Sequence, residues 1–233
     1  MKIKTLATGS TGNAYLVDDG CTVLLLECGI PLRELMRRSK YSLSCVSACL
    51  ITHEHGDHAR AVKQLIGLGI PIWCSKGTAT ALKIDGEPVV HSEMRAGHVV
   101  KIGTMAIMPI AVEHDAAEPL GWLIYSEASS QRLVFLTDTR VADVSLPAVH
   151  HIMVECNHMG LDSMGQTNAI HADRVIRNHM SLDDCIRFLL HQDLSQVQDI
   201  RLIHISHSHG DRVAMRNAVA AATGRQVIIA GQE

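Results

Sequence analysis

The strongest constraint on this chain is a group of metal-binding side chains in the stretch "CLITHEHGDHAR". The apolar run at its start predicts a buried strand, and four potential ligands follow directly: His53, His55, Asp57 and His58. Side chains at alternate positions of an extended segment point the same way, so His53 and His55 can reach one ion together. Gly56 permits a tight turn, after which Asp57 and His58 can face a neighbouring ion. The fold must therefore present the end of this strand to further ligands.

The composition supports a metal site and excludes several other classes of protein. The chain of 233 residues has 15 histidines, which are common metal ligands, and a formal net charge of −3. Its seven cysteines are scattered and include no C-x-x-C pair, so they predict neither a disulfide framework nor a cysteine zinc site. No apolar run approaches the roughly 18 residues that a membrane helix needs, and the first residues lack the apolar core of a signal peptide. We therefore expect a cytoplasmic protein without membrane contact.

Short strands and helices alternate along the chain. Turn residues and apolar runs predict strands at 3–7, 14–18, 22–27, 45–52, 70–74, 132–137, 151–155 and 200–206, and helices at 31–39, 58–68, 168–178 and 211–222. Another helix should begin close to Ser181, because Ser181 and Asp184 resemble a capping box. Two strand-rich halves, each finished by helices, predict two sheets covered by helices. No linker divides the chain, so we expect a single domain over residues 1–233.

The H-x-H-x-D-H motif after a buried strand resembles the hallmark of the metallo-β-lactamase superfamily, and the similarity covers nearly the whole chain. The resemblance implies an α/β fold, the four-layer αβ/βα sandwich, with a two-metal site at one edge. Further ligands would follow later strands, and this sequence offers His114 in "IAVEHDAAEPLGW" and Asp138 in "LVFLTDTR". By this resemblance one ion is bound by His53, His55 and His114, the other by Asp57, His58 and a late histidine, and Asp138 bridges them. His and Asp ligands suit Zn²⁺, Mn²⁺ and Fe²⁺.

One position departs from the family pattern. The superfamily usually has an aspartate at the end of an early strand, whereas "LLLECG" has Glu27 there. We expect the longer carboxylate to orient a ligand histidine without binding the metal itself.

Two residues outside the ligand set favour a phosphodiesterase. Glu155 ends the predicted strand "HIMVE", and His179 lies in "NHMS" just ahead of the helix at Ser181. In this respect the chain resembles the phosphodiesterase branches, including the tRNA 3′-processing enzymes. The stretches "GSTGNAYLV", "HDAAEPLGW", "NHMS" and "LIHIS" together resemble the YycJ-like bacterial nucleases. The first resemblance implies that Glu155 orients His179 and that His179 donates a proton to the departing oxygen. The alternative is that His179 is an exposed residue ahead of the helix.

The expected activity is dinuclear-metal-dependent hydrolysis of phosphodiesters in DNA or RNA through a metal-bridging hydroxide, with Asp57, Glu155 and His179 as catalytic residues. An alkoxide leaving group needs a proton far more than a thiolate does, so an added acid/base pair suits a nuclease. The alternative is a small-molecule hydrolase, such as a glyoxalase II-like thioesterase or a lactonase. Nucleic acid is the expected partner, and the sequence leaves open whether the chain forms a homodimer.

The late metal ligand has three candidates in "LIHISHSHGD": His204, His207 and His209. The end of this stretch repeats part of the first cluster but has Arg212 in place of its final histidine, so a second complete site is not expected. The phosphodiesterase relatives have a late ligand in an h-x-H-x-S context, which His204 and Ser206 fit. In an alternating strand these two share a face and His207 points the other way. We therefore predict His204 as the ligand, with His207 and His209 as substrate contacts or surface residues.

Two further segments are candidate substrate contacts. Ser10 and Asn13 lie in "GSTGN", whose backbone N–H groups could meet phosphate oxygens, although a simple hairpin turn is the alternative. A basic run could bind a nucleic-acid backbone, but a solvated helix face is the favoured interpretation; it comprises Arg33, Arg37, Arg38 and Lys40.

Overall fold

The computed structural model describes residues 1–40, 42–140, 144–165 and 168–232. Its strands form two sheets, which are flanked by helices. The chain divides into two compact units: the first comprises Met1–Ala111 and Ala116–Gln131, and the second comprises Val112–Asp115 and Arg132–Glu233. The expectation of a single domain over residues 1–233 stays a prediction, and the two units are described in turn.

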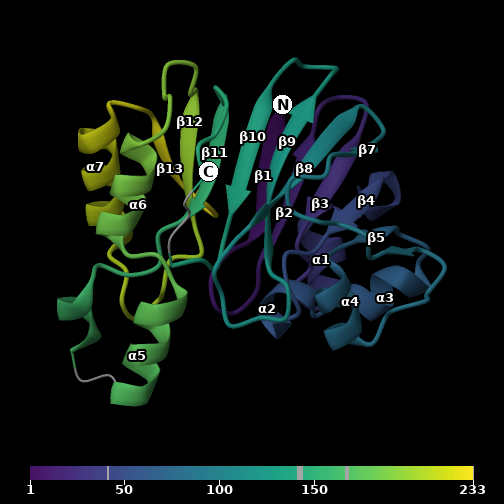
Figure 1. Cartoon of the computed structure of the whole chain (residues 1–233), viewed down its shortest axis with the longest axis horizontal. Coiled ribbons are helices and arrows are strands. Elements are labelled where there is room, and N and C mark those ends of the chain that lie inside the picture. Colours follow the sequence, from purple (N-terminus) through teal and green to yellow (C-terminus); the bar gives the residue numbers. More distant parts are fainter. Residues whose placement is uncertain (41, 141–143, 166–167, 233) are drawn as a thin grey trace. The chain divides into compact units, whose positions relative to one another are not determined.

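The first unit contains a six-stranded sheet in the order β1-β2-β3-β4-β5-β6 (Figure 1). Its strands are β1 (Lys2–Ala7), β2 (Ala14–Asp18), β3 (Val23–Leu26), β4 (Ala48–Leu50), β5 (Ile72–Trp73) and β6 (Val90–His91). The first three are antiparallel, and β3 to β6 are parallel. Strands β7 (Val100–Ile102), β8 (Met105–Ala111) and β9 (Leu120–Ser126) are antiparallel to one another. The helices are α1 (Leu32–Arg38), η1 (Ser42–Cys45), α2 (Gly56–Ala59), α3 (Val62–Gly67) and α4 (Lys76–Leu82).

Continuous apolar runs form the middle of the six-stranded sheet because both of its faces are covered. Every residue of 24–26 and of 48–51 is fully buried, as expected for parallel strands packed on two sides. The strand predicted at 45–52 is shorter, since β4 ends at Leu50. The helix predicted at 58–68 is two short helices, α2 and α3, and the first begins already at Gly56. The motif residues His53 and His55 therefore lie in the loop between β4 and α2.

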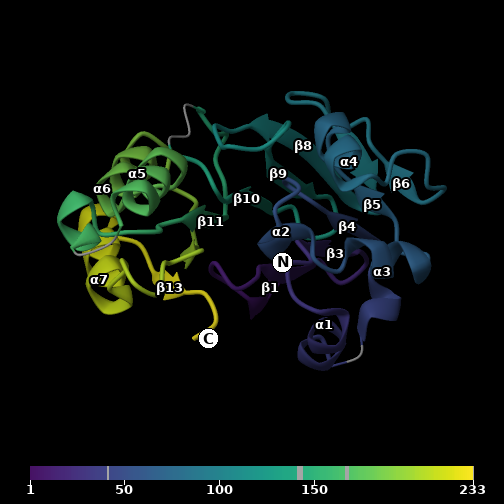
Figure 2. The ribbon, with the colours of Figure 1, turned by 90° about the horizontal axis from the view of Figure 1, so that it is seen from below.

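The second unit contains four parallel strands and the three longest helices. The strands are β10 (Arg132–Leu136), β11 (His151–Glu155), β12 (Asp199–Ile203) and β13 (Val227–Ile229), and the helices are η2 (Leu161–Met164), α5 (Ala169–Asn178), α6 (Leu182–Leu190) and α7 (Arg212–Thr223). Helix α7 packs against α6 and β13 (Figure 2). Because the carboxyl ends of parallel strands meet at one edge of a sheet, the residues that follow β10, β11 and β12 gather there.

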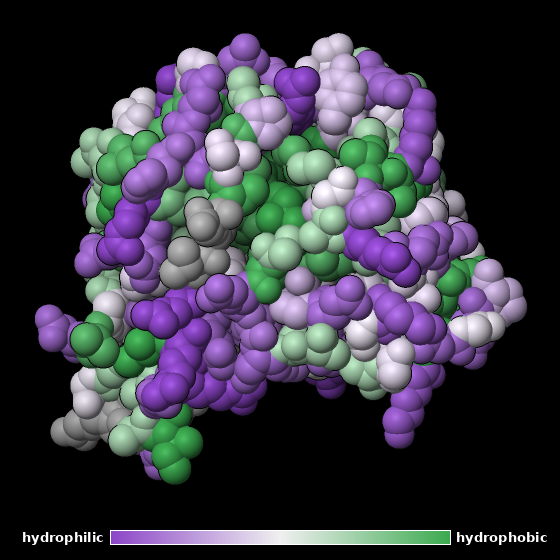
Figure 3. Space-filling view, viewed as in Figure 1, coloured by the Kyte–Doolittle hydropathy of each residue, from purple (hydrophilic) through white to green (hydrophobic). Residues whose placement is uncertain are grey.

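Several described side chains of η2 and α5 are exposed. Leu161 and Ile170 are 72% and 82% exposed, and Figure 3 shows hydrophobic side chains beside hydrophilic ones at this end of the unit. Val175 and Met180, by contrast, are buried. Helix α5 is thus anchored mainly near its carboxyl end, where it leads into His179.

Among the described residues, no helix combines the length and the apolar character needed to cross a membrane. The cytoplasmic location stays a prediction.

Helix α6 begins directly after Ser181, as predicted from the sequence, and has the side-chain hydrogen bond of an N-cap. Ser181 is the N-cap residue, and its hydroxyl oxygen accepts a hydrogen bond from the Asp184 N–H at 3.1 Å. Replacing Ser181 with Ala removes this acceptor, so the free energy of unfolding should fall by about 1 kcal/mol. Urea denaturation followed by circular dichroism measures the change. Ser208→Ala, at an exposed position outside any helix, is the control and should change it by less than about 0.5 kcal/mol. Equal effects of the two substitutions would show that the cap does not stabilise α6.

Candidate active site

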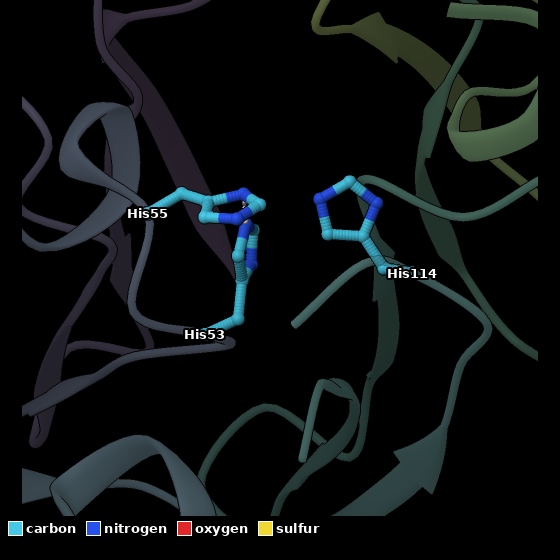
Figure 4. A group of neighbouring side chains, drawn as sticks. All are labelled: His53, His55 and His114. Carbon is cyan, nitrogen blue, oxygen red and sulfur yellow. Dashed lines mark hydrogen bonds between the residues drawn. The ribbon is translucent and has the colours of Figure 1, made fainter. Parts of the chain in front are cut away.

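In the first unit, His53 and His55 bring two ring nitrogens together. Nε2 of His53 lies 3.1 Å from Nδ1 of His55, and the ring planes cross at 82° (Figure 4). Nδ1 of His53 lies 2.9 Å from the Thr52 hydroxyl, which leaves Nε2 to face His55. Two nitrogens that bind one tetrahedral Zn²⁺ at the usual bond length lie about 3.3 Å apart. The pair therefore fits the requirement for sharing one ion.

His58 lies between two carboxylates. Its ring is fully buried, with Nδ1 3.3 Å from Glu27 Oε2 and Nε2 3.5 Å from Asp57 Oδ2. Burial raises the pKa of Glu27, and this effect outweighs the opposing influence of His58 and Thr52. The Thr52 N–H donates to Glu27 Oε1 at 3.1 Å, which fixes the carboxylate. Glu27 thus lies beside a candidate ligand histidine, as the sequence predicted, and can orient its ring.

The loop around Asn13 packs against the turn that carries the motif residues Asp57 and His58. The Asn13 side chain is fully buried, accepts a hydrogen bond from the Gly9 N–H at 3.0 Å and donates to the Asp57 carbonyl at 3.3 Å. Gly29 passes so close that a side chain there would overlap the Asp57 carbonyl. These contacts fix the turn that carries Asp57 and His58. Of the two predicted substrate contacts in this loop, Ser10 is exposed and Asn13 is not.

In the second unit, Glu155 joins the predicted acid/base histidine to the predicted late ligand. Its Oε1 accepts hydrogen bonds from Nδ1 of His179 at 2.7 Å and from Nδ1 of His204 at 2.9 Å. Its Oε2 accepts from the N–H groups of Thr139 at 3.1 Å and Met180 at 3.2 Å. These contacts come from three segments of the chain. The fully buried carboxylate therefore fixes the orientation of both histidine rings.

These contacts shift the pKa values of both partners. Burial alone would raise the pKa of Glu155, but the charge and hydrogen bonds of His179 and His204 hold it below its usual value. Burial would lower the pKa of His179, but the Glu155 carboxylate raises it above its usual value. The pair therefore favours an ionised Glu155 beside a protonated His179, which is the state that a general acid needs.

His114 lies among the same residues of the second unit. Its Nδ1 lies 3.2 Å from the Asn178 carbonyl, and its Nε2 lies 3.3 Å from Asp115 and 3.6 Å from Asp138 Oδ2. Burial lowers the pKa of His114, although Asp138 opposes the shift. A neutral ring that donates from Nδ1 leaves Nε2 as the ligand atom, which is the arrangement that metal-binding histidines commonly show.

One group of side chains in the second unit is compact enough to bind a metal ion. Ligand atoms of Asp138, Glu155, His179 and His204 all lie within 4.8 Å of one another. Asp138 Oδ1 is 3.3 Å from Nδ1 of His204. The donor set of carboxylate oxygens and imidazole nitrogens suits Zn²⁺, Mn²⁺ and Fe²⁺ alike.

Three candidate site residues have left-handed backbone conformations. Glu27, Asp138 and His204 have φ angles of 64°, 48° and 52°. Such angles are uncommon for residues other than glycine, and they concentrate at functional sites, where surrounding contacts maintain them. All three residues come directly after a strand or within two residues of its end. The left-handed turn redirects each side chain at the point where regular pairing stops.

The position of His204 corrects one step of the sequence argument. The predicted strand 200–206 ends at Ile203, so His204 does not belong to an alternating strand and shares no strand face with Ser206. His204 is nevertheless buried and contacts Glu155, whereas His207 is exposed. The left-handed turn therefore separates the two histidines.

His207 and His209 lie on the loop between β12 and α7. His209 is buried, and its carbonyl accepts a hydrogen bond from the Met159 N–H at 3.0 Å. His207 lines a cleft of about 450 Å³ with five other residues: Ser206, Gly210, Asp211, Arg212 and Val213. Of the two predicted substrate contacts, His207 is thus the more accessible.

Two of the four basic residues near α1, Arg37 and Arg38, form ion pairs and hydrogen bonds within the protein. Arg37 and Arg38 both bond to Glu34, and Arg38 also donates to the Leu6 carbonyl. Lys4 donates to the Arg38 carbonyl. These contacts favour the interpretation as a solvated helix face over a nucleic-acid contact.

Sequence reasoning missed Asn157, which lies two residues after Glu155. Its Nδ2 donates to the His204 carbonyl at 2.9 Å, and its N–H donates to the Met180 carbonyl at 2.9 Å. A buried asparagine in a polar loop gives little signal, because both of its partners are distant in the sequence. Its position two residues after a predicted catalytic glutamate was the available clue.

A family model described as Beta-lactamase superfamily domain matches residues 22–205. The chain belongs to the beta-lactamase superfamily. It is 24% identical to the exodeoxyribonuclease YycJ of Bacillus anthracis over 234 residues, which cover 94% of this chain and 88% of that protein. This confirms the family that the motif had indicated.

Solved structures of other proteins share the fold. The metallo-beta-lactamase fold protein YhfI from Bacillus subtilis aligns with a TM-score of 0.76 and 17% identity, over 98% of this chain and 95% of that one. The short form of human tRNase Z aligns with a TM-score of 0.65 and 13% identity, over 99% and 96% of the two chains. The predicted fold class, an αβ/βα sandwich, is confirmed.

The contact between Glu155 and His179 predicts a measurable shift. In Glu155→Gln, burial still lowers the pKa of His179 but the carboxylate no longer raises it, so this pKa should fall. A pH titration of the ring by nuclear magnetic resonance, on protein freed of metal by a chelator, measures it. Asp193→Asn removes an exposed carboxylate of the same unit and should leave the titration of His179 unchanged. Coincident curves for wild type and Glu155→Gln would contradict the hydrogen bond.

Proposed function

We propose that the protein is a metal-dependent phosphodiesterase that hydrolyses DNA or RNA. The observation that carries the proposal is the buried Glu155 carboxylate bonded to both His179 and His204, in a chain of the beta-lactamase superfamily. A hydrolase that only activates water on metal ions needs no such pair. A phosphodiester needs it, because the departing alkoxide is a poor leaving group until it is protonated. Similarity to the exodeoxyribonuclease YycJ supports a nucleic acid as the substrate.

The proposed metal ligands are those expected from the sequence. His53, His55 and His114 would bind one divalent ion, Asp57, His58 and His204 the other, and Asp138 both. The paired nitrogens of His53 and His55 and the Nδ1 contacts of His114 and His204 support this assignment. Two bound divalent ions, Zn²⁺ or Mn²⁺ with Fe²⁺ as a further candidate, would lower the pKa of a water molecule and would place positive charge opposite the phosphate.

The residues of the chain have distinct roles in this proposal. Nδ1 of His179 donates to Glu155, so Nε2 is the atom that would deliver a proton to the leaving oxygen. Glu155 keeps the ring oriented and favours its protonated form. Asp57, with its side chain 25% exposed, would act as a ligand and as an acceptor for a proton from the attacking water. Glu27 and Asn13 would hold His58 and Asp57 in place rather than contact substrate.

The cleft beside His207 is the proposed place for a flanking phosphate. His207 and Arg212 lie on its lining, and both side chains can donate hydrogen bonds to phosphate oxygens. Ser10, exposed on the loop of the first unit, is a further proposed contact. His209 is buried, so its contribution would be to the shape of the loop.

A substrate panel tests the proposed activity. Wild-type protein loaded with Zn²⁺ or Mn²⁺ should hydrolyse bis(p-nitrophenyl) phosphate and single- or double-stranded DNA or RNA. In His179→Ala, turnover of nucleic acid should fall about 100-fold or more, because general acid catalysis typically contributes that much. The activated diester, whose leaving group needs no proton, should be affected far less. His191→Ala, an exposed histidine at the end of α6, is the matched control.

The same panel can refute the proposal. Turnover of a glutathione thioester or a lactone, with none of the phosphodiesters, would identify a small-molecule hydrolase. Equal losses on both phosphodiesters in His179→Ala would exclude its role as the acid.

The metal assignment has its own test. His204→Ala should lose one of two bound ions, because the proposed second ion loses its late ligand. His207→Ala should keep both. Metal content after dialysis, measured by mass spectrometry, distinguishes the two histidines. Loss of an ion from His207→Ala with retention of both in His204→Ala would reverse the assignment.

A further inference from the structure

The loop that follows β11 is bonded to the turn that carries His179. The Asn157 N–H donates to the Met180 carbonyl at 2.9 Å, and the Leu182 N–H donates to the His158 carbonyl at 2.9 Å. His158 and Ser181 also form an isolated parallel bridge. The two segments thus run side by side over the residues directly after His179.

The ring of His158 faces this turn and has a defined tautomer. It is 3% exposed, and its Nδ1 accepts a hydrogen bond from the Gly160 N–H at 3.1 Å. Because an accepting nitrogen carries no proton, the proton of the neutral ring lies on Nε2. Burial lowers the pKa of His158 despite the opposing effects of the His179 carbonyl and Glu155, so the ring is neutral near pH 7.

The Nε2–H group of His158 is buried and makes no hydrogen bond of normal geometry within the described part of the chain. The carbonyl of His179 lies near enough to favour a proton on this ring. Buried donors without a partner are rare in native proteins, and each requires an explanation. The nearby carbonyl offers one, since a small adjustment of the turn would complete the bond.

The ring and the N–H of His179 already have partners, so its carbonyl is the group that His158 can hold in place. The ring is bonded to Glu155, and the N–H of His179 donates to the Val175 carbonyl at 3.0 Å. The next N–H, that of Met180, also binds Glu155. His179 is the carboxyl-terminal cap of α5 and has an extended backbone, so the peptide group after it sets the direction in which the ring leaves the chain.

We propose that His158 is a positioning residue for His179: its Nε2–H holds the His179 carbonyl and thereby keeps the imidazole of His179 aimed at the leaving oxygen. This inference rests on the proposed function, in which His179 is the general acid. If His158 only filled space in the core, its loss would instead weaken every activity of the protein alike.

Two substitutions separate the nitrogens of His158. In His158→Gln, the side-chain amide nitrogen can occupy the place of Nε2 and keep the donor. In His158→Asn, the side-chain oxygen can occupy the place of Nδ1 and keep the acceptor for Gly160, but the donor is lost. His151 supplies the control, because it is also buried in the second unit and its Nδ1 is 2.7 Å from Asp199 Oδ2 at the other end of β11.

The leaving group of the substrate provides the readout. In His158→Asn, kcat on a dinucleotide with an alkoxide leaving group should fall about 10-fold to 100-fold, as for residues that orient a functional group. KM should be unchanged, and turnover of bis(p-nitrophenyl) phosphate should be nearly unchanged. His158→Gln should retain most of the dinucleotide activity. In His151→Asn, any loss of activity should be equal on the two substrates.

A measurement independent of activity completes the test. The proton on Nδ1 of His179, bonded to Glu155, should give a strongly downfield magnetic resonance signal. That signal should shift or vanish in His158→Asn and persist in His158→Gln. Equal losses on both substrates, or an unchanged signal in His158→Asn, would overturn the positioning role. If wild-type protein hydrolysed no phosphodiester, the proposed function would fail, and the signal would still decide whether His158 positions His179.

Discussion

The buried carboxylate of Glu155 is the interaction on which the second unit depends. A carboxylate removed from water is costly unless hydrogen bonds replace its hydration. Glu155 receives them from the rings of His179 and His204 and from the N–H groups of Thr139 and Met180. The same bonds that make its burial tolerable therefore determine where two functional histidines point. Stability and site geometry have one physical origin here.

Parallel strands explain why these groups meet. Strands β10, β11 and β12 run in the same direction, so the residues after each strand emerge at one edge of the sheet. Asp138 and His204 then adopt left-handed backbone conformations, which turn their side chains toward Glu155 and each other. A residue in this conformation needs support from its surroundings, and Asn157 provides some by donating to the His204 carbonyl.

Much of the site could be predicted because its signals are local. The H-x-H-x-D-H motif, the strand that ends at Glu155 and the cap at Ser181 each lie within a few consecutive residues, and each is found where expected. The reasoning that predicted His204 as the late ligand was weaker. Its choice over His207 relied on strand alternation, but β12 ends at Ile203 and a left-handed turn separates the two. A positive φ at a residue other than glycine leaves no mark in the sequence.

The buried supporting residues were harder still to predict. Asn13 was expected to contact substrate, yet its side chain binds Gly9 and Asp57 inside the protein. No role was predicted for Asn157 or His158. Asn157 contacts Met180 and His204, and His158 contacts Leu182, all of them more than 20 residues away, and one sequence gives no measure of such distances. Local patterns thus indicate the groups that perform chemistry, while the groups that aim them depend on tertiary contacts.

The position of His179 shows why those tertiary contacts matter for activity more than for stability. Helix α5 is largely exposed, with Ile170 82% accessible, so packing along its length does little to fix its carboxyl end. The end is held instead by buried Val175 and Met180 and by the polar contacts of Glu155. In a dry environment those polar contacts are strong and directional. A change in one of them should misdirect the imidazole of His179 while the sheet beneath stays folded, because the sheet's own strands are paired independently of it.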